Sequence, residues 1–241
     1  MPQFTKKIKA DAILWDFDGT LADSSAKNYN ITLQILDKVA PHLTSGTLPS
    51  WLQNKANYHK AIQQAENWRD LYRDYFGMAL EDIQAAGPMW EDHQAQDNTE
   101  VTLYDGIVDT INELATIPMG VSSANSSYNI NRVLNNNGII SSFRSVVGYE
   151  TFPPEAQKPA ADPGMQCLAE VLEETDGKTI VYVGDHVADV IFSRNIADRL
   201  GPSSTVISVA VTYSGAEPDR WRVQPDEVIE SPAELADWVK V

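Results

Sequence analysis

The chain is 241 residues long and 43% hydrophobic, which is enough for a folded core and argues against a disordered chain. Its 18 Lys and Arg residues against 34 Asp and Glu residues give a formal net charge of −16, which disfavours binding to nucleic acid or to an anionic membrane surface. A single cysteine, Cys167, excludes an intramolecular disulfide bond, and no apolar run approaches the length of a transmembrane helix. We therefore expect an acidic, soluble protein of the cytoplasm.

The first predicted strand is Ala12–Trp15, a continuous apolar run that leads into the sequence Asp-Phe-Asp-Gly-Thr. The two carboxylates of that sequence, Asp16 and Asp18, are close enough to repel each other, so a cation or a proton must offset their charge. One of them could then act as a nucleophile and the other as a general acid and base. The alternative is an ordinary turn after a strand, in which Asp, Gly and Thr are all common.

A helical insert is predicted to follow this motif. Residues from about 22 to 98 contain helix-compatible stretches separated by Pro and Gly, without a convincing strand. These stretches are Asn28–Val39, Trp51–Phe76 and Met78–His93. The polar segment Gln94–Val101 is interpreted as the linker that returns the chain to its first domain. We predict a cap domain over residues 22–98 inserted into a core domain of residues 1–21 and 99–241.

The remainder of the chain alternates short apolar runs with helical patterns. The predicted strands are Met119–Ser122, Ser145–Val147, Thr179–Val183 and Thr205–Val211. The predicted helices are Ile107–Ala115, Tyr128–Asn136, Gly164–Glu174, Ala188–Leu200 and Pro232–Val239. This alternation is typical of an α/β fold in which helices wrap a parallel sheet.

Polar residues stand where several of these strands end. In an open parallel sheet, ligands bind beyond the carboxyl ends of the strands, so these residues are candidates for a site. Asp185 ends the strand Thr179–Val183, and Asp189 follows it by about one helical turn. Two carboxylates in this arrangement suit Mg²⁺, although they could instead cap the following helix.

Two further candidates carry less information of their own. Lys158, which precedes Pro159, could serve as a point charge for a phosphate group or could be a solvated surface lysine. The hydroxyl group of Ser123, together with the following backbone amides, could hold a phosphoryl oxygen, but Ser is common in loops.

Taken in order, Asp-Phe-Asp-Gly-Thr-Leu, a Ser at a strand end, Lys-Pro and Gly-Asp-x-x-x-Asp resemble the haloacid dehalogenase superfamily. Residues 16–24 are similar to its phosphoglycolate phosphatase-like group. The resemblance covers about two thirds of the chain. It implies a Rossmann-like, three-layer parallel sheet core with an inserted all-helical cap. It also implies a Mg²⁺-dependent phosphatase that hydrolyses a small phosphomonoester, such as phosphoglycolate or a sugar phosphate.

The resemblance assigns roles to four aspartates. Asp16 would attack phosphorus and form an aspartyl-phosphate, while Asp18 would protonate the leaving oxygen and later deprotonate the attacking water. Mg²⁺ would be held by the carboxylate of Asp16, the backbone carbonyl of Asp18 and the carboxylate of Asp185. Asp189 would lie beside this metal site as a ligand or as a neighbour of the ligands.

The same resemblance names the residues that would hold a small phosphorylated metabolite. Ser123, Ala124 and Lys158 would bind the phosphoryl group, and Asn28 in the insert is a candidate substrate contact. The insert would act as a cap that closes over the substrate, excludes water and selects the leaving group.

Three alternatives remain open. A sugar phosphomutase of the same superfamily typically has a histidine where this chain has Asn28. A dehalogenase or a phosphonatase is disfavoured because Asp18 stands where those groups have a different residue. A non-catalytic module that binds phosphate or Mg²⁺ would keep the same residues without turnover. The sequence leaves open whether the protein is a monomer or a homodimer.

Overall fold

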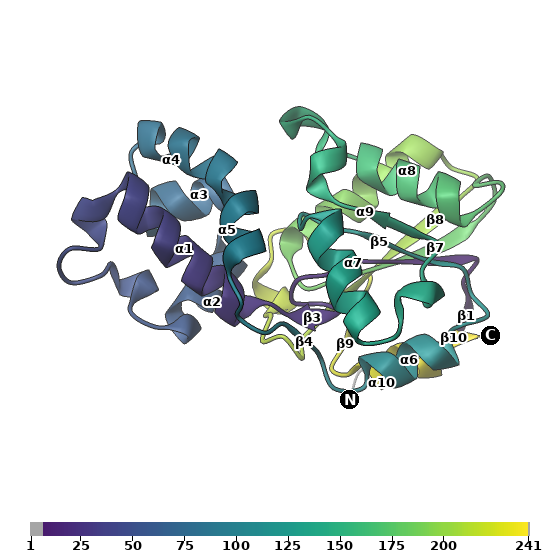
Figure 1. Ribbon diagram of the computed structural model, residues 1–241. Helices are drawn as coiled ribbons and strands as arrows, with labels where there is room; N and C mark the ends of the chain where they lie inside the picture. The colour runs from purple at the N-terminus through teal and green to yellow at the C-terminus, as the bar shows by residue number, and fades with distance from the viewer. Residues whose placement is uncertain (1–6, 241) are drawn as a thin grey trace. The chain divides into compact units, whose positions relative to one another are not determined.

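The computed structural model describes residues 7–240 and divides into two compact units (Figure 1). An α/β unit combines the chain up to Asp23 with the chain from Thr102, and a helical unit spans Ser24–Val101. The predicted limits of the insert are 22 and 98. In the structure β3 (Ala22–Asp23) pairs antiparallel with β4 (Thr102–Leu103). These two short strands therefore belong to the α/β unit.

A six-stranded parallel sheet forms the centre of the α/β unit, with the strand order β6-β5-β2-β7-β8-β9. Its members are β2 (Ala12–Trp15), β5 (Met119–Ser122), β6 (Ser145–Val147), β7 (Thr179–Gly184), β8 (Thr205–Val211) and β9 (Glu227–Ile229). All four residues of β2 are buried, as its continuous apolar sequence predicts for a central strand. Trp15, its last residue, pairs with Val121 of β5 and Val183 of β7. The carboxyl ends of these three strands therefore meet at one edge of the sheet.

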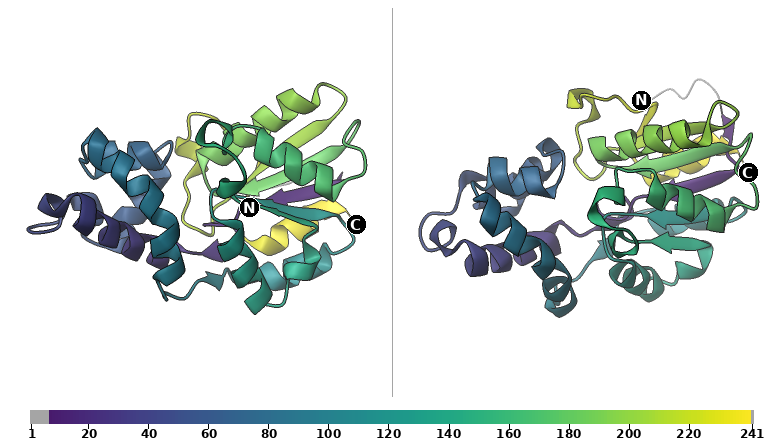
Figure 2. Two further views of the ribbon diagram at one scale, coloured as in Figure 1. Left: turned by 45° about the horizontal axis from the view of Figure 1, so that its top comes forward. Right: turned by 90° about the horizontal axis from the view of Figure 1, so that it is seen from above.

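Helices cover both faces of this sheet, so the unit has three layers (Figures 1 and 2). One layer contains α8 (Asp162–Val171) and α9 (Val187–Leu200), which pack on the strands from β6 to β8. The other contains α6 (Ile107–Glu113), α7 (Ser127–Asn136) and α10 (Pro232–Trp238). The predicted α/β fold with a parallel sheet is confirmed. The edge strand β9 is absent from the predicted strands.

Short elements complete the unit. At the edge opposite the carboxyl ends, β1 (Ile8–Lys9) pairs in parallel with β10 (Val239–Lys240). Single 3₁₀ turns occupy the connections at Ile140–Ser142, Tyr149–Thr151, Pro154–Ala156 and Pro218–Arg220. None of the helices within residues 7–240 is both long and apolar enough to cross a membrane.

Every regular element of the helical unit is a helix. Its α-helices are α1 (Ser25–Val39), α2 (Lys55–Gln64), α3 (Trp68–Asp70), α4 (Leu80–Ala86) and α5 (Trp90–Gln96). A π-helical turn, η3, covers Leu71–Tyr75, and 3₁₀ turns cover Pro41–Leu43, Ser50–Leu52 and Gly87–Met89. Buried side chains from these elements, including Ile35, Tyr58 and Tyr72, form a separate hydrophobic core.

The helix-compatible stretch Trp51–Phe76 contains only helical elements, as predicted, in several pieces. The helix α2 ends at Gln64, and a new one begins where Asn67 accepts hydrogen bonds from the backbone N–H groups of Arg69 and Asp70. One boundary predicted for this unit needs correction. The predicted linker begins too early, because residues 94–96 are the last residues of α5.

The true return segment is bound to α1 by side chains. Lys27 Nζ donates to the backbone oxygen of Asp97 at 2.5 Å, and Gln34 Nε2 donates to Asp97 Oδ2 at 3.1 Å. Asn30 Nδ2 donates to Thr99 Oγ1 at 2.9 Å. The Lys27 side chain is only 2% exposed, so these contacts bury a charged group inside the helical unit.

Candidate active site

Asp16 follows β2 directly and extends its ladder, since its backbone N–H donates to the carbonyl of Val183 at 2.8 Å. The chain then turns tightly, because the carbonyl of Phe17 accepts from the N–H groups of Leu21 and Ala22, each at 3.0 Å. Gly19 lies in this turn with φ +74°, and a Cβ atom there would lie 2.0 Å from Asp185 Oδ2. The turn therefore requires glycine both for its backbone conformation and for the space that Asp185 occupies.

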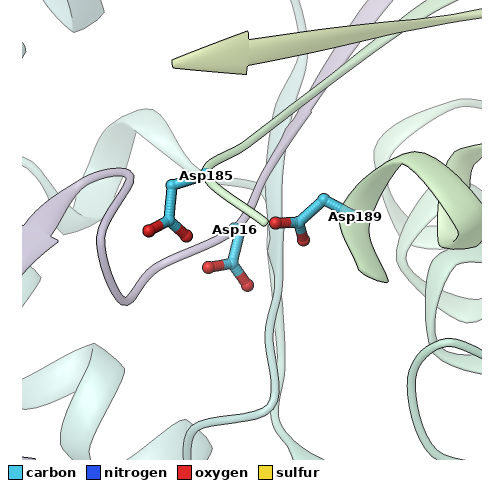
Figure 3. A group of neighbouring side chains, drawn as sticks. All are labelled: Asp16, Asp185 and Asp189. Atoms are coloured by element: carbon cyan, nitrogen blue, oxygen red, sulfur yellow. The ribbon is translucent and has the colours of Figure 1, made fainter. Parts of the chain in front are cut away.

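Asp185 and Asp189 reach the same place from β7 and α9. Asp185 follows the end of β7, and Asp189 lies in the first turn of α9, where it accepts from the backbone N–H of His186 at 2.9 Å. A Cβ atom on Gly184 would lie 2.2 Å from Asp189 Cγ, so this glycine makes room for the carboxylate. Oxygen atoms of Asp16, Asp185 and Asp189 lie within 4.8 Å of one another (Figure 3).

Lys158 brings a positive charge into this acidic cluster. Its Nζ atom lies 2.7 Å from Asp16 Oδ1 and also forms an ion pair with Asp189. The Lys158 side chain is 8% exposed, so the ammonium group is almost fully removed from solvent. The structure thus places the predicted lysine beside the predicted nucleophile, although the two are far apart in the sequence.

Burial and charge crowding change how these groups titrate. Burial raises the pKa of Asp16 to about 7, with Lys158 opposing this rise and Asp189 adding to it. Burial, followed by the charges of Asp189 and Asp16, raises the pKa of Asp185 well above its usual value. Burial alone would lower the pKa of Lys158, but the attraction of Asp16 and Asp189 outweighs it and raises that pKa.

These groups fit a divalent cation. Three buried carboxylates face one ammonium group, which leaves negative charge in a site with little access to water. All three offer carboxylate oxygens, the ligand type that Mg²⁺ prefers. Lys158 pairs with both Asp16 and Asp189, so a bound cation would balance the negative charge that this one ammonium group leaves on the three carboxylates.

Asp18 is held by a residue that the sequence-based prediction missed. Asn125 Nδ2 donates to both carboxylate oxygens of Asp18, at 3.0 and 2.8 Å. The amide oxygen of Asn125 accepts from the backbone N–H of Ser126 at 2.7 Å and from Asn129 Nδ2 at 3.2 Å. These two donors fix the orientation of the amide, so its NH₂ group must face Asp18.

The remaining predicted residues lie in two places. Ser123 follows β5 and is buried; its N–H donates to the carbonyl of Val147 at 3.1 Å, and its Oγ accepts from the N–H of Asn125 at 3.3 Å. Ala124, next in the chain, is exposed. Asn28 belongs to the helical unit, where its Nδ2 donates to Ser24 Oγ at 3.3 Å. Its contact with a substrate stays a prediction.

The arrangement of strand-end aspartates, lysine and serine agrees with a comparison of the sequence with known families. The profile described as haloacid dehalogenase-like hydrolase matches residues 13–198. The chain belongs to this family. The match begins in β2 and ends in α9, so it contains every predicted site residue, including those of the helical unit.

Individual proteins of known sequence or structure are similar to this chain over most of its length. The pyrophosphatase PpaX of Bacillus velezensis is 25% identical over 215 residues, which cover 88% of this chain and 91% of that protein. A candidate phosphoglycolate phosphatase from Lactobacillus plantarum superimposes with a TM-score of 0.73 at 17% identity, covering 96% of this chain and all of that one. A haloacid dehalogenase-like family hydrolase from Streptococcus pneumoniae gives a TM-score of 0.73 at 19% identity, covering 95% and 98% of the two chains.

Proposed function

We propose that this haloacid dehalogenase-like hydrolase is a Mg²⁺-dependent phosphatase that acts on a small phosphomonoester, such as phosphoglycolate or a sugar phosphate, in the cytoplasm. The observation that carries the proposal is the buried cluster in which Lys158 Nζ lies 2.7 Å from Asp16 Oδ1, with Asp185 and Asp189 beside it. A carboxylate next to a fixed ammonium group and a cation site meets the two demands of phosphoryl transfer, which are in-line positioning and neutralisation of the phosphoryl oxygens.

In the first half of the proposed reaction, a carboxylate oxygen of Asp16 attacks phosphorus while the bond from phosphorus to the leaving oxygen breaks. Asp18 donates a proton to that oxygen, so the alcohol leaves as a neutral molecule. Lys158 and the hydroxyl and backbone groups of the Ser123–Ala124 turn hold the equatorial oxygens. Asp16 then carries the phosphoryl group as an aspartyl-phosphate.

In the second half, Asp18 takes a proton from a water molecule, whose oxygen attacks phosphorus. The bond between Asp16 and phosphorus breaks, which restores the Asp16 carboxylate and releases inorganic phosphate. Asn125 supports both halves because its NH₂ group binds both oxygens of Asp18 and keeps that carboxylate in one place. Proton transfer requires such placement within hydrogen-bonding reach of the reacting oxygen.

The proposed Mg²⁺ would be held by the carboxylates of Asp16 and Asp185 and by the backbone carbonyl of Asp18. When bound, it supplies positive charge to the phosphoryl oxygens. In the same scheme Asp189 binds Lys158 and so holds the ammonium group at the site. Thermal unfolding with and without Mg²⁺ tests the metal site without reference to turnover. Mg²⁺ should raise the Tm of the wild-type protein but not that of Asp185→Asn, whereas the exposed control Asp198→Asn should keep the full shift.

Release of inorganic phosphate from a panel of substrates tests the activity. The panel contains phosphoglycolate, several sugar phosphates, p-nitrophenyl phosphate and pyrophosphate, each with Mg²⁺ and again with EDTA. The proposal predicts release with Mg²⁺ that EDTA abolishes. Mg²⁺ binding by a folded protein that releases no phosphate from any of these compounds would instead favour a non-catalytic module. Conversion of one sugar phosphate into its isomer would favour the mutase.

Pyrophosphate is a second candidate substrate. The relative from Bacillus velezensis, whose alignment covers 88% of this chain, is named a pyrophosphatase. The phosphoanhydride bond of pyrophosphate would present the same kind of phosphoryl group to Asp16. The leaving group would be phosphate, which needs less protonation than an alcohol. A kcat/KM for pyrophosphate well above that for every monoester would select this substrate.

A further inference from the structure

The ammonium group of Lys158 is surrounded by more than carboxylates. Its Nζ atom lies over the ring of Tyr182, 5.1 Å from the centroid, and 5.4 Å from the centroid of the ring of Phe192. Both distances fall within the range in which an aromatic face attracts a cation. The two rings also contact each other edge to face, with centroids 5.1 Å apart. The ammonium group of the lysine therefore lies against two aromatic rings whose planes are nearly perpendicular.

Tyr182 is fixed in this position by its hydroxyl group as well as by packing. It is fully buried in β7, and its hydroxyl donates to the carbonyl of Ser122 at 2.9 Å, directly before Ser123. The same hydroxyl lies 3.4 Å from Asp189 Oδ1. One tyrosine thus contacts the lysine, the aspartate that pairs with the lysine, and the end of β5, which lies on the other side of β2 in the sheet. These polar contacts fix the orientation of the ring beside the ammonium group.

Phe192 is fixed from the opposite side. It lies three residues after Asp189 in α9, so both side chains project from the same face of that helix toward Lys158. A Cβ atom on Gly164 of α8 would lie 2.9 Å from Phe192 Cζ, which shows how closely the two helices approach at this ring. The ring of Phe192 therefore has little room to move toward α8.

We infer that Tyr182 and Phe192 form an aromatic cage that positions the ammonium group of Lys158 for the phosphoryl group; this inference rests on the proposed function. Asp16 and Asp189 both attract the ammonium group. If these two carboxylates alone held it, they would neutralise its charge. Aromatic faces attract a cation through their quadrupole without neutralising it. The cage therefore holds the lysine in place and leaves its charge available to a phosphoryl oxygen. Tyr182 and Phe192 are positioning residues in this scheme.

NMR of protein labelled with ¹³C at the lysine ε-carbon tests the cage without any need for turnover. Methylene protons beside an aromatic face shift upfield, so we expect the Lys158 signal, assigned by its loss in Lys158→Arg, to lie upfield of the exposed lysines. The shift should persist in Tyr182→Phe, which keeps the ring, and should shrink clearly in Tyr182→Leu and Phe192→Leu. If Tyr182→Leu does not fold, Phe192→Leu decides by the same criterion. An unchanged Lys158 signal in the leucine variants would overturn the inference.

Steady-state kinetics with p-nitrophenyl phosphate provides the second measurement. A cation–ring contact of ordinary strength corresponds to a fall in kcat/KM of about 3- to 30-fold in each leucine variant, with most of the activity retained in Tyr182→Phe. The control is Phe143→Leu, which removes a buried ring just before the amino end of β6, at the far edge of the sheet. Equal losses in Tyr182→Phe and Tyr182→Leu, or a loss matched by Phe143→Leu, would contradict the cage. A wild-type protein that releases no phosphate would count against the proposed function, and the NMR result would still decide on the cage.

Discussion

The helical unit and the α/β unit both bury charged side chains, but they surround them differently. In the helical unit, the ammonium group of Lys27 binds the backbone oxygen of Asp97 at 2.5 Å, and Lys27 Nζ lies 3.9 Å from the carboxylate of the same residue. In the α/β unit, three carboxylates face the single ammonium group of Lys158. A buried charge whose partner is in place offsets much of its desolvation cost, whereas a surplus of one sign is costly unless a ligand completes it. The charge buried in the helical unit is paired within the protein, whereas the surplus of negative charge in the α/β unit is suited to a bound ligand.

The largest effect should follow from changing the nucleophile. Asp16→Asn removes the charged oxygen that attacks phosphorus, so phosphate release should fall to the background of the assay. The fold should survive, because the amide has the same shape as the carboxylate and relieves charge crowding. Circular dichroism and phosphate release from the substrate panel measure both outcomes. A variant with a rate near that of the wild-type enzyme would exclude the covalent mechanism.

A smaller loss is expected at the residue that transfers protons. Asp18→Asn keeps the nucleophile but cannot donate or accept the proton, which should lower kcat by about 10²–10⁴-fold. The loss should be smaller for p-nitrophenyl phosphate than for an alkyl phosphate, because p-nitrophenolate leaves without protonation. Equal losses of kcat/KM on both substrates, which report the first half of the reaction, would argue against a role for Asp18 as an acid.

Asn125→Ala tests whether the orientation of Asp18 matters. The variant removes both N–H donors to the Asp18 carboxylate, and we expect kcat to fall by about 10- to 100-fold with little change in KM. Asn131→Ala, which changes an exposed asparagine of the following helix α7, is the control and should match the wild-type enzyme. A higher KM with unchanged kcat would show that Asn125 binds substrate instead.

Removing the buried charge of the helical unit should lower the free energy of unfolding. Lys27→Met removes the buried ammonium group that binds Asp97, leaving a buried backbone oxygen and carboxylate without that partner. We expect the free energy of unfolding of this unit to fall by about 3 kcal/mol, measured by urea denaturation of the full chain. Lys60→Met, an exposed lysine of α2, should change it by less than about 0.5 kcal/mol. Equal effects of the two variants would show that the buried contact adds nothing.

The smallest effect concerns a partly exposed ion pair in the α/β unit. Burial alone would raise the pKa of Asp226, but hydrogen bonds from Arg194 and Ser208 outweigh it and lower that pKa from 3.8. Because the pKa is lower in the folded state, the stability that Asp226 adds is present above pH 3.8 and is lost as the pH falls through the lowered value.

Arg194→Gln should therefore lower the free energy of unfolding at neutral pH by less than about 1 kcal/mol, and the difference from the wild-type protein should shrink in acid. Thermal or urea unfolding across this pH range measures the change, with Lys9→Gln, at an exposed lysine of the same unit, as the control. A difference that grows in acid would contradict the assignment.

The parts of the site that could be predicted from the sequence are those that directly end a strand. Asp16 and Asp185 follow apolar runs, and parallel strands bring such positions to one edge whatever the connections between them. Lys158 could be predicted only because it stood in order within a family pattern, since nothing in its own loop distinguishes it from a surface lysine. These residues could therefore be predicted from their order in the chain and from the rules of α/β folds.

Other features depend on tertiary contacts that leave no local pattern. Asn125 lies in a loop rich in Ser and Asn, and only the fold brings its amide to Asp18. Tyr182 is one residue of a buried strand, so its apolar neighbours mask its role beside Lys158. The edge strand β9 has three residues, too few for an alternating pattern to stand out.

The position of β2 at the centre of the sheet has a consequence for synthesis of the chain. Of the six strands of this sheet, β2 is synthesised first, but its neighbours β5 and β7 begin only at Met119 and Thr179. The whole helical unit emerges from the ribosome before either of them, and its core forms from contacts within residues 24–101. The apolar strand Ala12–Trp15 therefore stays unpaired in the sheet while the helical unit folds. Nascent chains that stop between Val101 and Thr179 should accordingly be the ones that most need a chaperone.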